Sequence, residues 1–220
     1  MKKTNSYILS PLRDQHAVLL GQTGTGKTTL GEVLCSRAPY VAVLDIKDEL
    51  FFPGYFRSYD FKEITKLDPE KFPKVIYAPT ADELLNEEAI DRFFRWTYDR
   101  ENTLVYCDEV YGATEHGLTI GHNRVLTRGR SRNVAIINGS QRPHLIPRNI
   151  LTEAKNWYVF YLGDILDRVA VENFSGISRE QIAALKPREF LFRRQGELVK
   201  GPFRLKFEGK NGREKSAVSV

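Results

Sequence analysis

The stretch AVLLGQTGTGKTTL, residues 17–30, decides the fold. Its first four residues are an apolar run that predicts a β-strand, and residues 28–37 predict the helix after a glycine-rich loop. The glycines let the backbone turn tightly, so that successive N–H groups and the helix N-terminus form a concave site for phosphate oxygens. A chance glycine-rich turn fits this order of elements poorly. We expect nine residues to contact a nucleotide: Gly21, Gln22, Thr23, Gly24, Thr25, Gly26, Lys27, Thr28 and Thr29.

Two residues of this loop carry its chemistry. Lys27 would reach the β- and γ-phosphates of ATP, and the hydroxyl of Thr28 would be a ligand of Mg²⁺. The loop therefore predicts an ATP and Mg²⁺ site.

Two carboxylates, Asp108 and Glu109, directly follow the apolar run of residues 103–107. Asp108 would hold the metal's water shell, and Glu109 would orient or polarise the attacking water as the catalytic carboxylate. Two solvated acids at the end of a strand are the plainer interpretation, but the loop upstream favours the functional one. Because a kinase needs no water-activating carboxylate, Glu109 favours ATP hydrolysis.

A further strand, predicted over residues 134–138, leads to Gln141. Ligands bind outside the carboxyl ends of parallel strands, so Gln141 should emerge at the same edge of the sheet as the loop and Asp108. An amide there can contact the γ-phosphate or the attacking water. A surface amide in the turn before Pro143 is the alternative.

Strands and helices alternate along most of the chain, which predicts an α/β fold with a mostly parallel sheet covered by helices on both faces. Residues 190–193 and 198–200 flank a turn and predict a C-terminal β-hairpin. We expect a single ATPase domain over residues 1–208 and a polar, flexible tail over residues 209–220. Further strands are predicted over 40–46, 74–77 and 157–162, and further helices over 81–98, 164–173 and 178–186.

The composition suits one globular domain, since 41% of the 220 residues are hydrophobic. The formal net charge of +5 is compatible with a polyanionic partner without proving one. Cys35 and Cys107 lie in apolar stretches and are expected to be buried, reduced thiols. Because there is no signal peptide and no apolar run of the roughly 18–20 residues that span a bilayer, we expect a soluble, cytoplasmic protein.

Three short segments together resemble one superfamily. Asp45-Ile46-Lys47-Asp48-Glu49 ends the second predicted strand, Asp108-Glu109 ends a later one, and Gly139-Ser140-Gln141-Arg142-Pro143 ends the next. This set resembles the FtsK–HerA superfamily of DNA-pumping P-loop ATPases, and residues 185–190 resemble that family's late Pro-x-Glu-Phe segment. The likeness runs from about residue 17 to about residue 192. It implies a P-loop NTPase fold of the RecA/FtsK–HerA kind.

The resemblance also implies a function. Cellular members add a barrel, a membrane anchor or a winged helix, for which this chain has no room. Such a bare motor looks most like the genome-packaging ATPases of tailless, membrane-containing phages and archaeal viruses. It implies an ATP-hydrolysing translocase of double-stranded DNA without sequence preference. It further implies a homo-oligomeric ring of five or six subunits, with capsid or vertex proteins as partners in the host cytoplasm or the virion.

The arginine-rich stretch RVLTRGRSR, residues 124–132, has three interpretations. An arginine can reach the γ-phosphate of a neighbouring subunit as a finger, for which Arg130 is favoured and Arg128 is second. Arginines such as Arg124 can instead follow DNA phosphates without reading bases. A solvated loop with scattered charge is the third interpretation. Two further basic residues are candidates for these roles: Lys47 and Arg142.

Three other functions remain open at this point. One is a cellular or conjugative translocase of the same superfamily. Another is a small-molecule kinase in which residues 128–132 form a phosphate-clamping lid, although Glu109 and Gln141 count against it. The third is a capsid-associated binding protein with a purely structural nucleotide site, against which the complete set of site residues argues.

Overall fold

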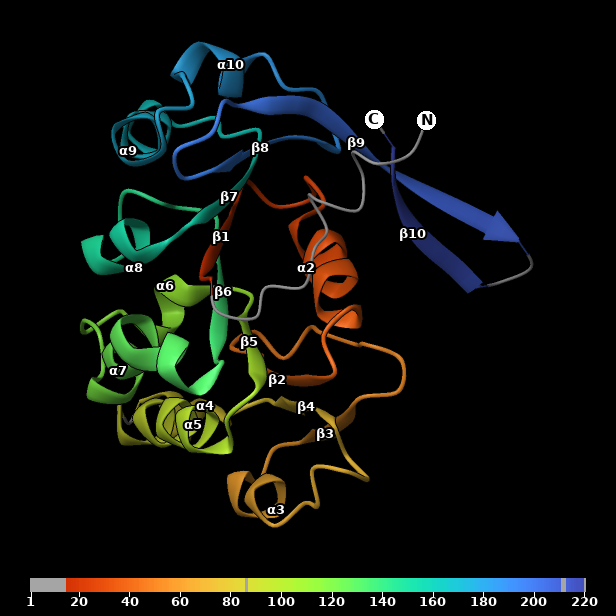
Figure 1. The fold of residues 1–220 in the computed structure, drawn as a ribbon, viewed down its shortest axis with the longest axis vertical. Coiled ribbons are helices and arrows are strands. Elements are labelled where there is room, and N and C mark those ends of the chain that lie inside the picture. Colours follow the sequence, from red (N-terminus) through yellow and green to blue (C-terminus); the bar gives the residue numbers. More distant parts are fainter. Residues whose placement is uncertain (1–14, 86, 211–212, 220) are drawn as a thin grey trace.

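The computed structural model describes residues 15–85, 87–210 and 213–219, and these form a mixed β-sheet with helices on both faces (Figure 1). The strands follow the order β10-β9-β8-β7-β1-β6-β5-β2-β4-β3 across the sheet. Their bounds are β1 (Ala17–Leu20), β2 (Tyr40–Leu44), β3 (Phe56–Ser58), β4 (Lys74–Tyr77), β5 (Thr103–Cys107), β6 (Ala135–Ser140), β7 (Asn156–Phe160), β8 (Glu189–Arg194), β9 (Lys200–Lys210) and β10 (Arg213–Ser219).

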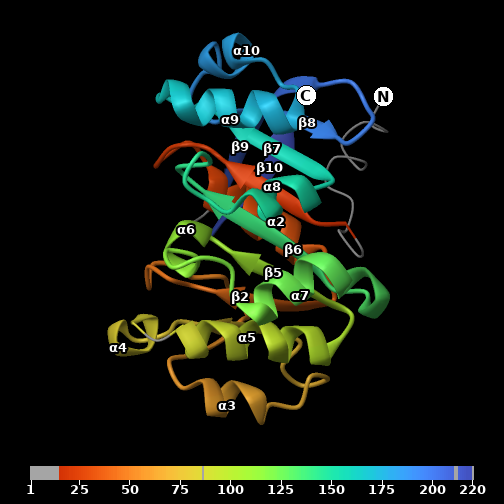
Figure 2. The same ribbon diagram turned by 90° about the vertical axis from the view of Figure 1, so that its left-hand side faces the viewer.

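The strands from β7 to β3 in this order run parallel, and β8, β9 and β10 are antiparallel to their neighbours. We call the edge where the parallel strands begin the amino edge, and the edge where they end the carboxyl edge. In Figure 2 the carboxyl edge, with α6, lies on the left and the amino edge lies on the right. The helices are α2 (Lys27–Ser36), α3 (Phe61–Thr65), α4 (Ala81–Leu84), α5 (Glu87–Arg100), α6 (Val110–Ala113), α7 (Ile120–Arg128), η1 (Gly129–Arg132, a 3₁₀ turn), α8 (Arg148–Glu153), α9 (Ile165–Ser175) and α10 (Arg179–Ala183).

The central strands are buried on both faces. In β1, Ala17 and Leu19 pack into a core with Leu30 and Leu34 of α2, whereas the alternate residues of the strand pack into a second core. That second core includes buried residues of α5, α7, α8 and α9, which lie on the face opposite α2 (Figure 1). Side chains alternate along a strand, so a strand covered on both faces must be apolar throughout. This explains why the predicted strands are continuous apolar runs.

A local signal fixes the start of α10, within the helix expected over 178–186. Ser178 accepts a hydrogen bond from the Gln181 N–H, and the Gln181 side chain accepts one from the Ser178 N–H at 3.2 Å, which together form a capping box. The helix expected over 81–98 is present as α4 and α5, with residue 86 outside the described part. The C-terminal hairpin is confirmed by the antiparallel pairing of β8 with β9.

Two features differ from expectation. The backbone forms the antiparallel pair β9 and β10 where a polar, flexible tail was expected over 209–220, of which residues 211–212 and 220 lie outside the described part. Helix α7 was not predicted because a polar residue, His122, occupies one of its core positions. The ring of His122 stacks on Phe94 with centroids 4.0 Å apart, and its Nε2 lies 3.2 Å from Asn138 Oδ1. No helix within the described ranges combines the length and apolar character that crossing a membrane requires.

Candidate nucleotide-binding and catalytic site

The loop between β1 and α2 depends on a glycine at its last position. Gly26 has φ 108° and ψ 11°, a left-handed conformation that glycine adopts without strain. A Cβ atom on Gly26 would also lie 2.7 Å from Leu205 Cδ1, so the Leu205 side chain would have to shift to accept it. The turn therefore leads directly into α2 at Lys27, and no side chain caps that end of the helix. The first N–H groups of α2 are thus left for a ligand.

Backbone hydrogen bonds hold the start of the loop against two neighbouring strands. The Gly21 N–H donates to the carbonyl of Ser140 at 3.1 Å, and the Gln22 N–H donates to the carbonyl of Tyr161 at 3.1 Å. Within the loop, Thr25 Oγ1 donates to the Gln22 carbonyl at 2.7 Å. The loop is therefore preformed by its own contacts with the ends of β6 and β7.

Lys27 is buried, and its ammonium donates to the Gln22 carbonyl at 3.2 Å. Burial lowers the pKa of Lys27, and the negative charges of Asp108 and Glu109 oppose this shift. A desolvated cation inside a ring of backbone N–H groups is stabilised by an anionic ligand. These residues fit a nucleotide triphosphate.

A hydroxyl and a carboxylate stand together beside the loop. Thr28 Oγ1 lies 3.2 Å and 3.4 Å from the two carboxylate oxygens of Asp108, and the Tyr106 hydroxyl donates to Asp108 Oδ1. Burial and the nearby Asp108 raise the pKa of Tyr106 well above its ordinary value, so the phenol remains a neutral donor. Gly31 makes room for this ring, because a Cβ there would lie 2.5 Å from Tyr106 Cζ.

This pair of oxygen groups fits Mg²⁺, which prefers hard oxygen ligands and usually shares its coordination shell with water and phosphates. Thr28 and Asp108 would hold the ion. Within the described ranges, no group of three or more His, Cys, Asp and Glu residues gathers in a metal-binding cluster.

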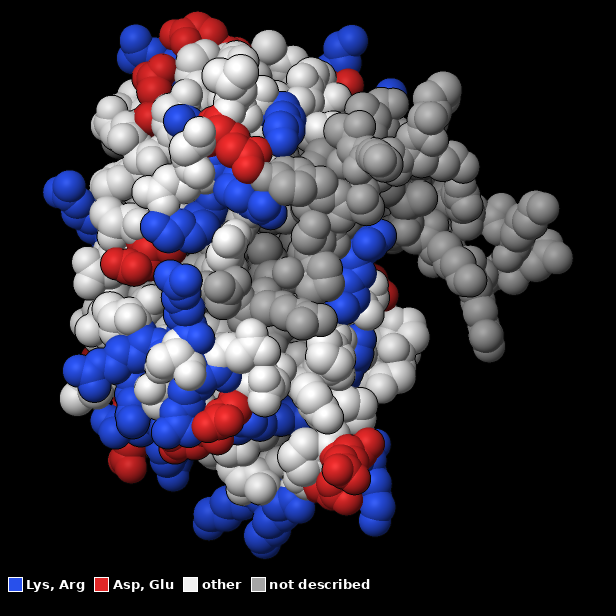
Figure 3. Space-filling view, viewed as in Figure 1, with Lys and Arg blue, Asp and Glu red and all other residues white. Residues whose placement is uncertain are grey.

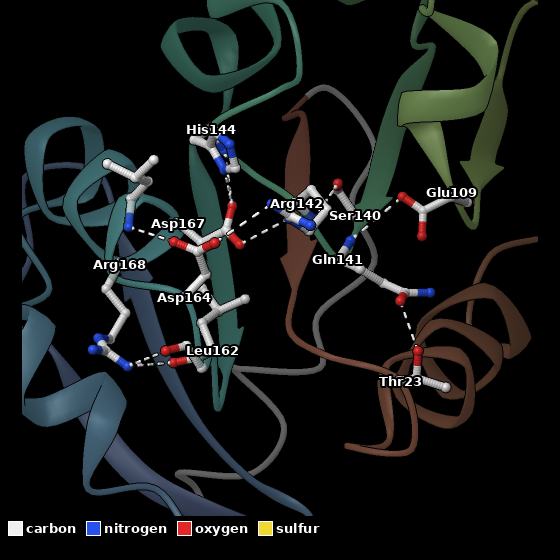
Figure 4. A network of polar contacts seen from close by, with 12 residues as sticks. Thr23, Glu109, Ser140, Gln141, Arg142, His144, Leu162, Asp164, Asp167 and Arg168 are labelled. Atoms are coloured by element: carbon white, nitrogen blue, oxygen red, sulfur yellow. Dashed lines mark hydrogen bonds and ion pairs between the residues drawn. The ribbon is translucent and has the colours of Figure 1, made fainter.

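Glu109 joins three of the motifs into one site (Figure 4). Its side chain is largely buried, with Oε2 3.4 Å from Lys47 Nζ and Oε1 accepting from the Gln141 N–H at 3.4 Å. Gln141 Oε1 in turn accepts from Thr23 Oγ1 at 2.6 Å. The ends of β1, β5 and β6 thus bring the predicted residues together, because β6 lies between the other two strands.

The Asp-x-Lys-x-Glu segment separates into two roles. Asp45 is buried and accepts hydrogen bonds from the Leu50 N–H and from Arg57, both at 2.9 Å, so it shapes the loop after β2. Lys47 instead points to Glu109 and belongs to the site. Sequence reasoning did not distinguish Lys47 from the other candidate cations, because the ion pair joins segments 62 residues apart.

A second polar network adjoins the site, and sequence reasoning missed it (Figure 4). The carboxylate of Asp167 on α9 is almost fully buried, with Oδ2 3.3 Å from Arg142 Nε and Oδ1 2.5 Å from His144 Nδ1. Asp164 Oδ2 accepts from Arg142 at 3.4 Å. The network therefore ties the segment that follows Gln141 to the start of α9. It borders a cavity of about 410 Å³ lined by Gln22, Thr23, Gln141, Arg142, Asp164 and Asp167.

The arginine-rich stretch lies at the other edge of the sheet. Arg128 ends α7 and Arg130 lies in η1, both exposed and both upstream of β6, at the amino edge. The Arg124 guanidinium lies 4.2 Å from the ring centroid of Tyr98, and that of Arg132 lies 5.0 Å from it. Arg124 and Arg132 therefore pack against the domain itself. None of the four lies at the carboxyl edge, where this chain's own phosphate loop is.

Comparison with known proteins finds a similar sequence and similar structures. DNA packaging ATPase P9 of Enterobacteria phage PRD1 is 26% identical over 183 residues, which cover 80% of this chain and 76% of the phage protein. The genome packaging NTPase B204 of Sulfolobus turreted icosahedral virus 2, solved with AMPPCP, has a TM-score of 0.69 at 18% identity, covering 86% of this chain and 96% of B204. The pCW3 conjugation coupling protein TcpA has a TM-score of 0.55 at 13% identity, covering 84% of this chain and 58% of TcpA. No protein-family model matches the chain.

The two kinds of comparison support different conclusions. The structural likeness to B204 and TcpA shows the fold, and the similarity to P9 extends along most of both sequences. The phosphate loop, Asp108 and Glu109 lie together at the carboxyl edge of the sheet, where ligands of such folds bind. By its fold and its phosphate-binding loop, the chain is a P-loop ATPase similar to the genome-packaging ATPases of these viruses.

Proposed function

We propose that the chain is an ATP-driven motor that moves double-stranded DNA into a viral capsid. The observation that carries the proposal is the place of Glu109 beside the phosphate loop, held by Lys47 at one oxygen and by the Gln141 backbone at the other. A carboxylate so placed suits the activation of water, and therefore hydrolysis rather than transfer to another acceptor. The DNA substrate is inferred from the similarity to PRD1 P9, a DNA packaging ATPase.

Each residue of the site has a role in this reaction. Lys27 and the N–H groups of the loop bind the β- and γ-phosphates. Thr28 and Asp108 would hold Mg²⁺, which would supply neutralising charge for the phosphates. Glu109 accepts a proton from the attacking water, and Gln141 orients that water or contacts the γ-phosphate. The hydrogen bond from Thr23 to Gln141 keeps the amide facing the loop.

We further propose that the motor is a homo-oligomeric ring of five or six subunits that binds capsid or vertex proteins and acts in the host cytoplasm. In such a ring Arg130, or Arg128 beside it, completes the nucleotide site of the next subunit. The place of both arginines at the amino edge supports this proposal, because they lie away from their own chain's loop. Head-to-tail contact between subunits pairs two different faces, as a closed ring requires.

The ATPase rate, measured with and without duplex DNA over a range of protein concentrations, tests the proposal. We expect DNA to raise the rate, and specific activity to rise with concentration as rings form. Binding to two unrelated duplexes should be equal and should weaken roughly 20-fold when salt doubles, for about five phosphate contacts. The Glu109→Gln protein is the control for contaminating ATPases. A rate indifferent to duplex DNA, or strong preference for one sequence, would contradict a DNA motor.

A further inference from the structure

A cavity at the amino edge of the sheet is lined by three basic side chains and two glutamines. It has a volume of about 250 Å³ and is lined by Gln15, Arg130, Lys155, Arg194 and Gln195. Among these described lining residues there is no carboxylate. No residue of this chain's own phosphate loop lines this cavity, so its own ATP does not explain the charge. Arg130, the proposed contact to a neighbour's nucleotide, is one of the five lining residues.

The sheet register explains why the cavity's residues converge. Asn156, the first residue of β7, is paired with Ala17 of β1 on one side and with Arg194 of β8 on the other. Gln15 and Lys155 precede these strands, so both reach the amino edge beside Arg194. The pairing of β7 with β1 and β8 therefore brings the lining residues together from distant parts of the sequence and holds them on a rigid sheet.

Buried Asn156 also orients two of the lining side chains. Its Nδ2 donates to Gln15 Oε1 at 3.4 Å, and its Oδ1 accepts from Arg194 Nε at 3.0 Å. On the opposite side, Lys155 Nζ donates to Gln195 Oε1. Both glutamines therefore use their carbonyl ends within the protein, and their amino ends remain donors. A cavity rich in cations and amide donors is suited to an anion.

A second cavity continues the same surface. It has a volume of about 370 Å³, shares Gln195 with the first cavity and adds Arg148 and Arg193. The rest of its lining is neutral and includes the apolar side chains of Leu151, Trp157 and Phe174. Its described lining residues also include no carboxylate. Figure 3 looks onto this side of the molecule, where Lys and Arg side chains are interspersed with Asp and Glu. The basic groups are thus spread over two adjoining cavities.

We propose that these two cavities bind consecutive phosphodiester groups of the DNA backbone. The proposal rests on the function proposed above and assigns the DNA contact to the edge opposite the nucleotide. Duplex DNA carries one negative charge for about every 1.7 Å of its axis, so a row of cations matches it better than a compact ligand does. Arginine forks and amide donors bind phosphate oxygens and read no base, which agrees with binding to any sequence.

Lys155→Glu is the sharpest test, because Lys155 is exposed and its replacement leaves the core intact. Affinity for a fluorescent duplex, measured by anisotropy, should fall on the order of tenfold or more at about 0.1 M salt, and the slope of log affinity against log salt should decrease by about 1. The matched control is Lys62→Glu on α3, an equally exposed lysine far from the cavities, which should stay near the wild-type affinity. ATP turnover without DNA should be unchanged in both proteins.

A second variant, Lys155→Ala/Arg194→Gln, removes two cations and keeps an amide donor for Asn156. It changes the local charge by two units, as Lys155→Glu does, and should lose a comparable amount of affinity without adding an acid. Its control is Lys62→Ala/Lys66→Ala. Equal losses in variant and control would overturn the proposal while leaving the DNA motor intact. A wild-type protein that binds no duplex would instead overturn the proposed function. If Lys155→Glu instead loses ATP turnover, regains it on mixing with Lys27→Ala and keeps its DNA affinity, the cavities belong to a neighbour's nucleotide and the DNA assignment is overturned.

Discussion

The two edges of the sheet present opposite kinds of electrostatics. At the carboxyl edge, acids and bases alternate at short range, as in the contacts of Glu109 with Lys47 and of Asp167 with Arg142. At the amino edge, cations line two cavities whose described lining residues include no carboxylate. Paired charges hold catalytic side chains in fixed positions, which ATP hydrolysis requires. Several cations of one sign instead attract a polyanion without fixing its position. The difference predicts that substitutions at the carboxyl edge change turnover and that those at the amino edge change association.

The largest effect should come from the carboxyl edge. Glu109→Gln keeps the size of the side chain and loses the base, so turnover should fall by up to about 10⁴-fold while ATP binding persists. Lys27→Ala should lose ATP binding as well, because the phosphates lose their main cation. Nucleotide binding and single-turnover hydrolysis, measured separately, distinguish the two variants. Wild-type turnover in Glu109→Gln would exclude Glu109 as the catalytic carboxylate.

Arg130→Ala tests whether the amino edge also takes part in chemistry. If Arg130 acts on the next subunit, the variant should fold and bind ATP but hydrolyse it about 10³-fold more slowly. Mixed with Lys27→Ala, it should regain part of the activity, because some interfaces of a mixed ring then carry neither defect. If mixed rings form and no activity returns, Arg130 belongs to the DNA contact alone and the two edges are functionally separate.

The strand between the two edges can be probed through His122, which contacts Asn138 of β6. Burial lowers the pKa of His122 to about 3. Below its ordinary pKa of about 6.5, the unfolded chain takes up a proton that the folded chain does not, so the free energy of unfolding falls as pH falls. From pH 7 to pH 5 this residue should account for a loss of about 2 kcal/mol.

Urea unfolding at the two pH values measures this loss. His122→Asn should show a smaller decrease in stability by that amount, and His116→Asn, at an exposed position, should behave like the wild type. An identical pH dependence in His122→Asn would mean that the His122 ring is not buried as described.

The smallest effect is expected at the network beside the site. Asp167→Asn removes the charge that holds Arg142 and His144, so Gln141 should be placed less well and kcat should fall about tenfold, with ATP affinity near that of the wild type. Asp164→Asn is the matched control, because Asp164 is more exposed and lies 3.4 Å from the same arginine. Equal kinetics in the two variants would show that the buried carboxylate does not position Gln141.

Most residues of the nucleotide site at the carboxyl edge could be predicted from the sequence, because one rule of parallel sheets places them together. Residues that follow parallel strands meet at one edge, so Lys27, Asp108 and Gln141 could be placed together from their positions after apolar runs. Asp167 could not be found in this way, because its partners follow β6, whereas Asp167 belongs to a helix after β7. Its spacing of three from Asp164 marks only one face of a helix.

The amino edge was less predictable for a related reason. Lys155 and Arg194 are unremarkable single cations in the sequence, and only the pairing of β7 with β8 makes them neighbours. The arginine-rich stretch was predicted to contact a nucleotide or DNA, but two of its members, Arg124 and Arg132, pack on Tyr98. Charge density along a sequence therefore did not separate exposed cations from those that stabilise the domain.

The position of β6 has a mechanical consequence. The strand connects η1 at one edge to Gln141 at the other, and it is hydrogen-bonded to β1 on one side and to β5 on the other. Sliding β6 along its axis would break both ladders at once, which costs far more than a local loop movement. The sheet is therefore a stiff frame, and we expect the power stroke to come from rotation of whole subunits, with displacement inside the domain limited to its loops.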